Sequence, residues 1–194
     1  MATAQPQPAG LLLNARFVAS PNHNARPAGA EVTLLVIHNI SLPPGQFGTG
    51  CVEQFFCNRL DWQAHPYFLG IEGMEVSAHL LIERSGALIQ FVPLHQRAWH
   101  AGRSCFEGQE NCNDYSIGIE LEGTDDQPYS DAQYESLVQV TLQLQQRFAQ
   151  LANERIVGHS DIAPGRKTDP GPAFDWARFR TQLLDAQLRQ GARR

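Results

Sequence analysis

The sequence lacks a long apolar run near its amino end. The run Leu11–Leu13 is far too short for a membrane span or for the core of a secretion signal, and no basic residues precede it. Long clusters of lysine and arginine are also missing and the formal net charge is -5, which argues against a nucleic-acid-binding groove. We therefore expect a cytoplasmic protein with no nucleic-acid partner and no membrane partner.

Cysteine is sparse, and none of the four cysteines belongs to a Cys-x-x-Cys pair. They are Cys51, Cys57, Cys105 and Cys112. This spacing argues against a structural zinc knuckle, which needs closely spaced pairs. Disulfides are unusual in the reducing cytosol. We predict four free thiols, with a Cys105–Cys112 disulfide as the alternative.

The overall composition is that of an ordinary globular protein. The 194 residues are 42% hydrophobic and 18% charged, enough to bury a sizeable core. A chain of this length is most simply one domain, and we expect a monomer. Residues 1–30, rich in Pro, Ala, Gly and Asn, predict a tail and an irregular wrap onto the body. We assign residues 31–188 to the domain and residues 189–194 to a frayed tail.

Four segments have the patterns of β-strands. Residues 32–38 form a continuous apolar run rich in β-branched residues, which is typical of a strand buried on both faces. Residues 77–82 and 87–92 predict a hairpin that turns at Gly86. Residues 116–122 alternate strictly between apolar and other side chains, which places Glu120 on the face opposite the apolar one.

Helical patterns separate these strands. A short helix is predicted near residues 52–60, and Ser130 with Gln133 forms a capping box that begins a helix running to about Leu151. A short strand at residues 155–159 and a last helix at residues 175–188 follow. Strands interspersed with helices predict an α/β domain with a mixed sheet flanked by helices.

Two histidines and one aspartate are suited to bind a catalytic zinc ion. His38 ends the first predicted strand, and His159 and Asp169 lie more than a hundred residues later. Structural zinc is usually enclosed by four protein ligands, whereas catalytic zinc has three and leaves a position for water. A lone histidine at a strand end is more often a core residue, so His38 becomes a ligand candidate only in combination with the other two.

Lys167 stands two residues before Asp169 and is the single lysine of the chain. In an extended backbone these two side chains project to the same side. A compact ammonium beside a metal ion could stabilise an oxyanion, although lysine is also common on protein surfaces. The isolated use of lysine at this position favours the functional interpretation.

Six separated motifs fall in order along the chain: Leu35–Asn39, Ser77–His79, Arg97–Gly102, Asn113–Glu120, Gly158–His159 and Lys167–Gly171. Together they resemble the AmpD-type 1,6-anhydro-N-acetylmuramoyl-L-alanine amidases, within the wider phage-lysozyme and peptidoglycan-recognition-protein amidase superfamily. The resemblance covers about residues 14–185. It is specific because all six motifs agree in order and in spacing.

The resemblance implies a zinc amidase that cleaves the amide between the lactyl group of muramic acid and the L-alanine of the stem peptide. It implies a small muropeptide substrate, one zinc ion per chain, and a role in recycling cell-wall fragments in the cytosol of a Gram-negative bacterium. The implied zinc ligands are His38, His159 and Asp169. Glu120 matches the general base and Lys167 the residue that stabilises the transition state.

Four further residues lie in motifs that line the groove of such enzymes, and we expect them to contact substrate: Asn39, Trp99, His100 and Arg166. For His100 a plain surface position is the alternative. Glu122 competes with Glu120 for the role of base because both point to the same face of the predicted strand, and we interpret Glu122 as structural. His79, inside an apolar segment, is expected to be structural or to support a metal ligand.

Two other functions remain in competition with the cytosolic amidase. The first is an exported amidase that acts on intact peptidoglycan, against which the absence of a signal sequence counts. The second is a silent muropeptide-binding module, against which the presence of three candidate ligands counts. We also predict that residues 101–113, which lack an apolar period, form a mobile loop with few buried contacts that closes over the groove.

Overall fold

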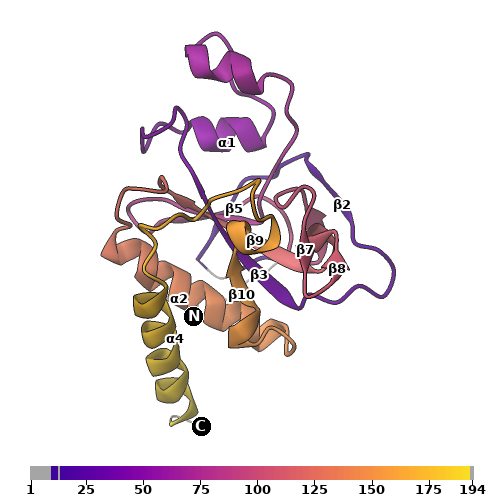
Figure 1. Ribbon diagram of the computed structural model, residues 1–194, viewed down its shortest axis with the longest axis vertical. Helices are drawn as coiled ribbons and strands as arrows, with labels where there is room; N and C mark the ends of the chain where they lie inside the picture. The colour runs from indigo at the N-terminus through magenta and orange to yellow at the C-terminus, as the bar shows by residue number, and fades with distance from the viewer. Residues whose placement is uncertain (1–9, 13, 193–194) are drawn as a thin grey trace, which may run out of the picture.

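The computed structural model describes residues 10–12 and 14–192, and its main element is a mixed β-sheet (Figure 1). Within these described residues the sheet has six strands in the order β1-β5-β4-β9-β3-β10, and β2–β6 and β7–β8 form two smaller sheets. The strands are β1 (Arg16–Phe17), β2 (His23–Ala25), β3 (Leu34–Ile40), β4 (Leu80–Ile82), β5 (Leu88–Gln90), β6 (Gln96–Ala98), β7 (Cys105–Phe106), β8 (Gln109–Glu110), β9 (Ser116–Glu122) and β10 (Ile156–Gly158). In the main sheet, β4 and β5 are antiparallel and the other neighbouring pairs are parallel. The predicted α/β domain with a mixed sheet is confirmed.

The central strands β3 and β9 run parallel and in register over seven residues, with His38 opposite Glu120. The alternation in the sequence of β9 suggested one apolar face and one polar face. All seven residues of β9 are nevertheless buried. The reason is that both faces of the sheet are covered, so that its polar side chains lie inside the protein.

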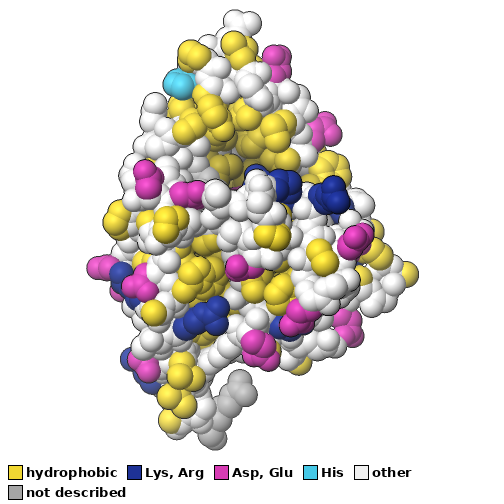
Figure 2. Space-filling model, viewed as in Figure 1, with side chains coloured by type: hydrophobic (Ala, Val, Ile, Leu, Met, Phe, Trp, Pro, Cys, Tyr) yellow, Lys and Arg dark blue, Asp and Glu magenta, His cyan; other side chains and the backbone are white. Residues whose placement is uncertain are grey.

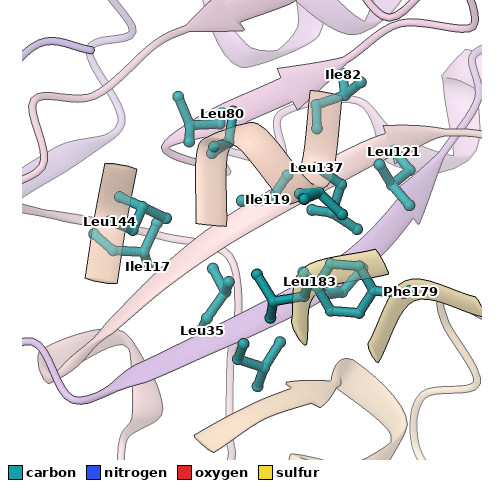
Figure 3. Packing of buried hydrophobic residues seen from close by; sticks show 14 of the residues in the cluster. Leu35, Leu80, Ile82, Ile117, Ile119, Leu121, Leu137, Leu144, Phe179 and Leu183 are labelled. Atoms are coloured by element: carbon teal, nitrogen blue, oxygen red, sulfur yellow. The ribbon is translucent and has the colours of Figure 1, made fainter. Parts of the chain in front are cut away.

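Two long helices cover one face of the sheet, α2 (Asp131–Arg147) and α4 (Trp176–Gly191) (Figure 1). Their apolar side chains interlock with those of the strands, as Figure 3 shows for Leu35, Leu137 and Leu183. The predicted capping box of α2 is present. The helix ends four residues before Leu151, at Arg147. Leu151 lies in the following loop but is buried, so it continued the apolar pattern and made the predicted helix too long.

Shorter elements cover the opposite face. Helix α1 (Cys51–Phe56) and the 3-10 helix η1 (Pro66–Ile71) pack on β4 and β5 in one apolar cluster, in which Phe68 is buried. The left-handed conformation of Asn58 (φ 55°) follows α1, which is shorter than predicted. Helix α3 (His159–Ile162) and residues of the β7–β8 region pack on β3 and β10 in another cluster. The carboxyl-terminal halves of β3 and β9 lie between the two clusters.

The amino-terminal segment is more regular than its composition suggested. Strand β1 adds to the edge of the main sheet and β2 pairs with β6. Arg26 anchors the segment by donating hydrogen bonds to the carbonyl oxygens of Asn113 (3.0 Å) and Ser116 (2.8 Å). Strands of two or three residues are too short to give a period in the sequence. Of the predicted tails, positions 1–9, 13 and 193–194 lie outside the described residues. Residues 189–191, predicted to be frayed, belong to α4, which continues to Gly191.

The segment 101–113 is exposed over most of residues 102–111, as its composition suggested, but both of its ends are buried. It folds into the β7–β8 hairpin, and the side-chain oxygen of Asn113 accepts hydrogen bonds from the backbone N–H groups of His100 (3.1 Å) and Ala101 (2.8 Å). Cys112 is fully buried, and its thiol contacts the hydroxyl of Tyr115. Polar side chains, which show no apolar period in the sequence, provide this anchoring. Mobility of the exposed part and its closure over the groove stay predictions.

All four cysteines are free in the part of the chain that the structure describes. The alternative of a Cys105–Cys112 disulfide is therefore not observed: Cys105 is exposed and Cys112 buried. None of the described helices combines the length and apolar character needed to cross a membrane.

Candidate metal centre and its groove

The three predicted metal ligands come together at the end of the central strands. Strand β10 pairs with β3 so that Gly158 lies opposite Ile37, and His159, the next residue, therefore stands beside His38. The backbone N–H of Ser160 donates to the carbonyl oxygen of Asp169 (3.0 Å), which fastens the loop that carries the third ligand. A β-carbon on Gly158 would stand 2.8 Å from Pro170, so this close approach requires glycine.

The donor atoms form a nearly equilateral triangle. His38 Nδ1 lies 2.9 Å from His159 Nδ1, and each of these atoms lies 3.0 Å from Asp169 Oδ2. Two ligand atoms of a tetrahedral zinc ion stand about 3.3 Å apart when each is about 2.0 Å from the metal. The three atoms fit an ion of that size after a small outward shift.

The protonation of the histidines also favours a bound cation. His159 Nε2 lies 3.1 Å from the carbonyl oxygen of Ala101 and must donate to it, so in the neutral ring Nδ1 has a free electron pair. Burial lowers the pKa of His38 to about 4, so this ring is also neutral at pH 7. Burial alone would raise the pKa of Asp169, but the hydrogen bonds to both histidines hold it below its usual value. One carboxylate oxygen and two imidazole nitrogens thus converge at one point, and a bound cation could take the place of the hydrogen bonds between them.

Glu120 faces this cluster from β9. Its side chain is buried, yet Oε2 has no hydrogen-bond partner among the described residues. Burial, reinforced by the charge of Asp169, raises its pKa well above the usual range, and Lys167 partly opposes the shift. A buried carboxylate with an unpaired oxygen has the properties of a general base.

Glu122, the competing carboxylate, has its hydrogen bonds satisfied. Its Oε1 accepts from the backbone N–H of Gly48 (2.6 Å) and its Oε2 from that of Arg84 (3.2 Å). Glu122 therefore holds two loops in place. The geometry favours Glu120 over Glu122 as the reactive carboxylate.

Lys167 and Arg166 differ in what they contact. Lys167 is exposed at the groove, and its charge lowers the pKa of both Glu120 and His38. Arg166 donates from Nη2 to the carbonyl oxygens of Ala101 (2.7 Å) and Arg103 (2.6 Å). Lys167 is thus placed to act on a charge near the cluster, whereas Arg166 fastens the ligand loop to the hairpin segment.

The remaining predicted site residues all line the groove, but in different ways. Asn39 donates to Asp125 Oδ1 (2.8 Å), and the indole N–H of Trp99 donates to Asn24 Oδ1 (2.9 Å). His100 is buried behind His38, with 2.9 Å between Nδ1 of His100 and Nε2 of His38. The alternative of a surface position for His100 is wrong. His79 is structural, since its Nδ1 accepts from the N–H of Gly118.

The groove has a volume of about 580 Å³ and two unlike walls. One wall is apolar and comes from α1, η1 and the segments beside them: Ile40, Leu42, Pro44, Phe55, Phe56, Tyr67, Ile71, Met74 and Val76. Figure 2 shows hydrophobic side chains gathered in a hollow in the upper part of the molecule, with Lys or Arg side chains along its lower border. The other wall is polar and includes the metal cluster, Glu120 and Asp125.

Two further groove residues, Asp125 and Tyr67, are not identified by the sequence analysis. Asp125 lies just beyond the carboxyl end of β9, a position where polar side chains gather at the edge of a parallel sheet. That position was a signal that could have identified it. Tyr67 is 46% exposed on the apolar wall, and no pattern in the sequence distinguished it from a core aromatic residue.

Known proteins share this architecture over most of the chain. The protein 1,6-anhydro-N-acetylmuramyl-L-alanine amidase AmpD of Enterobacter cloacae is 56% identical over 174 residues, which are 90% of this chain and 92% of the relative. A crystal structure of a selenomethionine derivative of AmpD superposes with a TM-score of 0.88 at 54% identity, covering 91% of this chain and 98% of the other.

A more distant relative has been solved with a ligand. It is N-acetylmuramyl-L-alanine amidase AmiD of Escherichia coli, in complex with the substrate anhydro-N-acetylmuramic acid-L-Ala-D-gamma-Glu-L-Lys. It superposes with a TM-score of 0.58 at 30% identity, covering 81% of this chain and 60% of the other. The profile of the family described as N-acetylmuramoyl-L-alanine amidase matches residues 28–172, which contain the whole metal cluster and Glu120. Sequence, fold and site therefore agree that the chain belongs to the N-acetylmuramoyl-L-alanine amidase family.

Proposed function

We propose that this protein is a zinc-dependent amidase that cleaves the bond between the lactyl group of 1,6-anhydro-N-acetylmuramic acid and the L-alanine of the stem peptide. The observation that carries the proposal is the convergence of three donor atoms, 2.9 to 3.0 Å apart, in one groove with the unpaired Oε2 of Glu120. The similarity to the AmpD amidase of Enterobacter cloacae and to the AmiD amidase solved with an anhydromuropeptide supports this choice of substrate.

Zinc is the metal that best suits the donor set. Two imidazoles and one carboxylate from His38, His159 and Asp169 are a ligand combination used by catalytic zinc sites, while cysteine is absent from the cluster. When bound, zinc lowers the pKa of a coordinated water towards neutrality and polarises a carbonyl group.

Glu120 is placed to accept a proton during attack and later to return it to the leaving amine. Its raised pKa brings the carboxyl group closer to neutral pH, where a group can both accept and donate. The register that sets Glu120 opposite His38 on the neighbouring strand keeps this carboxylate beside the metal ligands. The ammonium of Lys167 supplies positive charge for the oxyanion that develops on the scissile carbonyl.

The two walls of the groove suit the two halves of a muropeptide. The 1,6-anhydro bridge takes up two hydroxyl groups of the sugar. The bridged sugar is therefore less polar than the same sugar without the bridge and can lie against an apolar wall. The peptide, which carries amides and carboxylates, needs the polar wall. We propose Asn39, Trp99, His100 and Arg166 as the residues that line or support these positions.

We further propose that the enzyme is a cytoplasmic monomer that takes part in recycling of cell-wall fragments. Light scattering of the purified protein and fractionation of the cells that produce it test these two statements directly. A stable dimer in light scattering, or enzyme in the extracytoplasmic fraction, would contradict the corresponding statement.

The deciding experiment offers two substrates to the zinc-loaded protein. We expect free stem peptide, identified by mass spectrometry, from an anhydromuropeptide and little from intact sacculi. Glu120→Gln, which alters the proposed base and leaves the metal ligands in place, is the matched control. Release from sacculi alone would favour an enzyme of intact peptidoglycan, and binding of the muropeptide without cleavage would favour a silent binding module.

A further inference from the structure

We propose that His100 is a positioning residue, which through a buried hydrogen-bonded row fixes the tautomer and the orientation of the metal ligand His38. The inference rests on the proposed metal site. It gives His100 a different role from the substrate contact that the sequence suggested. The row consists of His38, His100 and Ser116, three residues that are distant in the sequence.

The row is continuous and closed to solvent. His38 Nε2 lies 2.9 Å from His100 Nδ1, and His100 Nε2 lies 3.1 Å from the hydroxyl oxygen of Ser116. Exposed fractions are 1% for His38, 9% for His100 and 0% for Ser116. The rings of His38 and His100 meet edge to face, with their planes at 85°. Each ring nitrogen therefore has one defined partner on this side of the cluster.

Counting protons shows why the row has only two internally consistent arrangements. A neutral imidazole carries one N–H, so its two nitrogens are one donor and one acceptor. Either His38 donates to His100, which donates to Ser116, or every bond points the other way. In the second arrangement the proton of His38 sits on Nδ1, the atom that faces His159 and Asp169. Only the first arrangement leaves that atom free to bind a metal ion.

The backbone beneath His100 is shaped to hold its ring in the row. A β-carbon on Gly118 would lie 2.4 Å from His100 Cγ, so any other residue at this position of β9 would displace the ring. The neighbouring histidine, His79, is fully buried as well and its ring meets that of His100 edge to face, but its hydrogen bonds go to the backbone of Gly118 and Gln96 rather than to the row. His79 thus provides a matched comparison for a buried imidazole outside the row.

Partners of this kind matter because they set the orientation and the basicity of a metal-binding imidazole. Removing the group that a ligating histidine donates to costs about 10- to 100-fold in metal affinity. His38 ends an apolar stretch of β3, and its two ring nitrogens contact only the metal cluster and His100 among the described residues. We therefore assign to His100 the preparation of His38 for metal binding.

The first test measures zinc affinity by competition with a chromophoric chelator. We expect His100→Leu to bind zinc about 10- to 100-fold more weakly than the parent, while His100→Gln, whose amide can accept from His38 and donate to Ser116, stays within about fivefold. His79→Leu is the control, with lower thermal stability but unchanged zinc affinity. Thermal unfolding in excess chelator shows whether each variant folds without metal.

The second test observes the protons. Long-range ¹H–¹⁵N NMR of the zinc-loaded parent should find both His38 and His100 protonated at Nε2, with slowly exchanging N–H signals. Protonation of His100 at Nδ1 would overturn the proposal, as would equal zinc affinities of His100→Leu and the parent. Failure of the parent itself to bind zinc would instead overturn the proposed function, and this inference with it.

Discussion

The two faces of the central strands β3 and β9 differ in chemistry although both are buried. On the face covered by α2 and α4, the side chains are apolar over most of the length of the strands, as Leu35 and Ile119 illustrate, and Asn39 near the end of β3 is the polar exception. On the opposite face the character changes along β3. Leu34 and Val36 belong to an apolar cluster, whereas His38, the next residue on that face, belongs to the metal cluster.

Burial therefore does not separate residues that stabilise the protein from residues that act in the reaction. What distinguishes the two kinds of buried polar residue is whether their polar atoms have hydrogen-bond partners inside the protein. Glu122, at the end of β9, has both carboxylate oxygens bonded to backbone N–H groups. Glu120, two residues earlier, has a buried oxygen without a hydrogen-bond partner among the described residues, and such an oxygen is costly to bury. Costs of this kind are typical of functional sites, which supports the proposed role of Glu120 as a base.

The largest expected effect comes from removing a metal ligand. His159→Ala should lose most of its zinc, and turnover should fall by about 10³-fold or more, since a metal ion supplies several kcal/mol of transition-state stabilisation. Metal analysis after dialysis and a rate assay on anhydromuropeptide measure the two effects. Full zinc content together with normal turnover would exclude this site.

Replacing a reactive side chain while the metal ligands are kept should have the next largest effect. Glu120→Gln and Lys167→Ala should keep zinc and fold normally, while kcat falls by at least ~10²-fold, the lower range for a general base or an oxyanion donor. Zinc content and kcat are measured on the same preparations. Normal kcat in Glu120→Gln would assign the base to another residue.

The same Glu120→Gln variant tests whether burial raises the pKa of the Glu120 carboxyl group, because a raised pKa makes the free energy of unfolding depend on pH. The folded-state pKa of Glu120 lies above the unfolded value, so its stabilising contribution is present below the usual glutamate pKa and is lost as pH rises through the raised one. With chelator present, the parent should therefore lose stability relative to Glu120→Gln as pH rises. Chemical unfolding across this pH range provides the measurement, and a constant difference would contradict a raised pKa.

Changing the satisfied carboxylate should affect stability more than catalysis. Glu122→Gln leaves one acceptor for two backbone N–H groups, which should lower the unfolding free energy by about 1–3 kcal/mol. We expect kcat to change little, because this side chain faces two loops rather than the metal cluster. A loss of turnover larger than that of Glu120→Gln would reverse the assignment of the two glutamates.

The smallest effect is expected on the helix-covered face. Ile119→Val removes one methylene from a fully buried residue that neighbours Glu120 in the sequence but points to the other face. The unfolding free energy should fall by about 0.5–1.5 kcal/mol, with zinc affinity and kcat unchanged. Urea unfolding and a rate assay test this. A clear loss of zinc binding would show that the two faces are not independent.

The sequence predicted the parts of the molecule that repeat a pattern over several residues. The apolar run of β3, the alternation in β9 and the capping box at Ser130 gave the main elements and their approximate bounds. The two-residue strand β1 was not predictable because pairing with β5, rather than its own sequence, makes it a strand. The anchoring of the ends of residues 101–113 was not predictable for a similar reason, since contacts with distant residues such as Arg166 provide part of it.

Those residues of the candidate site that belong to recognisable sequence motifs were predicted. Residue types and order pointed to His38, His159 and Asp169, and the structure brings their donor atoms together. The role of His100 was not accessible from the sequence, because it depends on which ring nitrogen faces which neighbour across two strands. Asp125 was missed because a single aspartate after a strand gives too weak a signal unless the strand is known to end at the site.

The single lysine at the groove has a practical consequence for labelling. Lys167 is exposed and is the one lysine side chain in the sequence, so an amine-selective reagent has one side-chain target in the whole protein. Reductive methylation with ¹³C-formaldehyde would attach an NMR-active reporter there while retaining its positive charge. The α-amino group of the chain is methylated as well, but Lys167 would give the one side-chain signal, so ligand titrations could be followed from the groove without introducing any cysteine or removing the native ones.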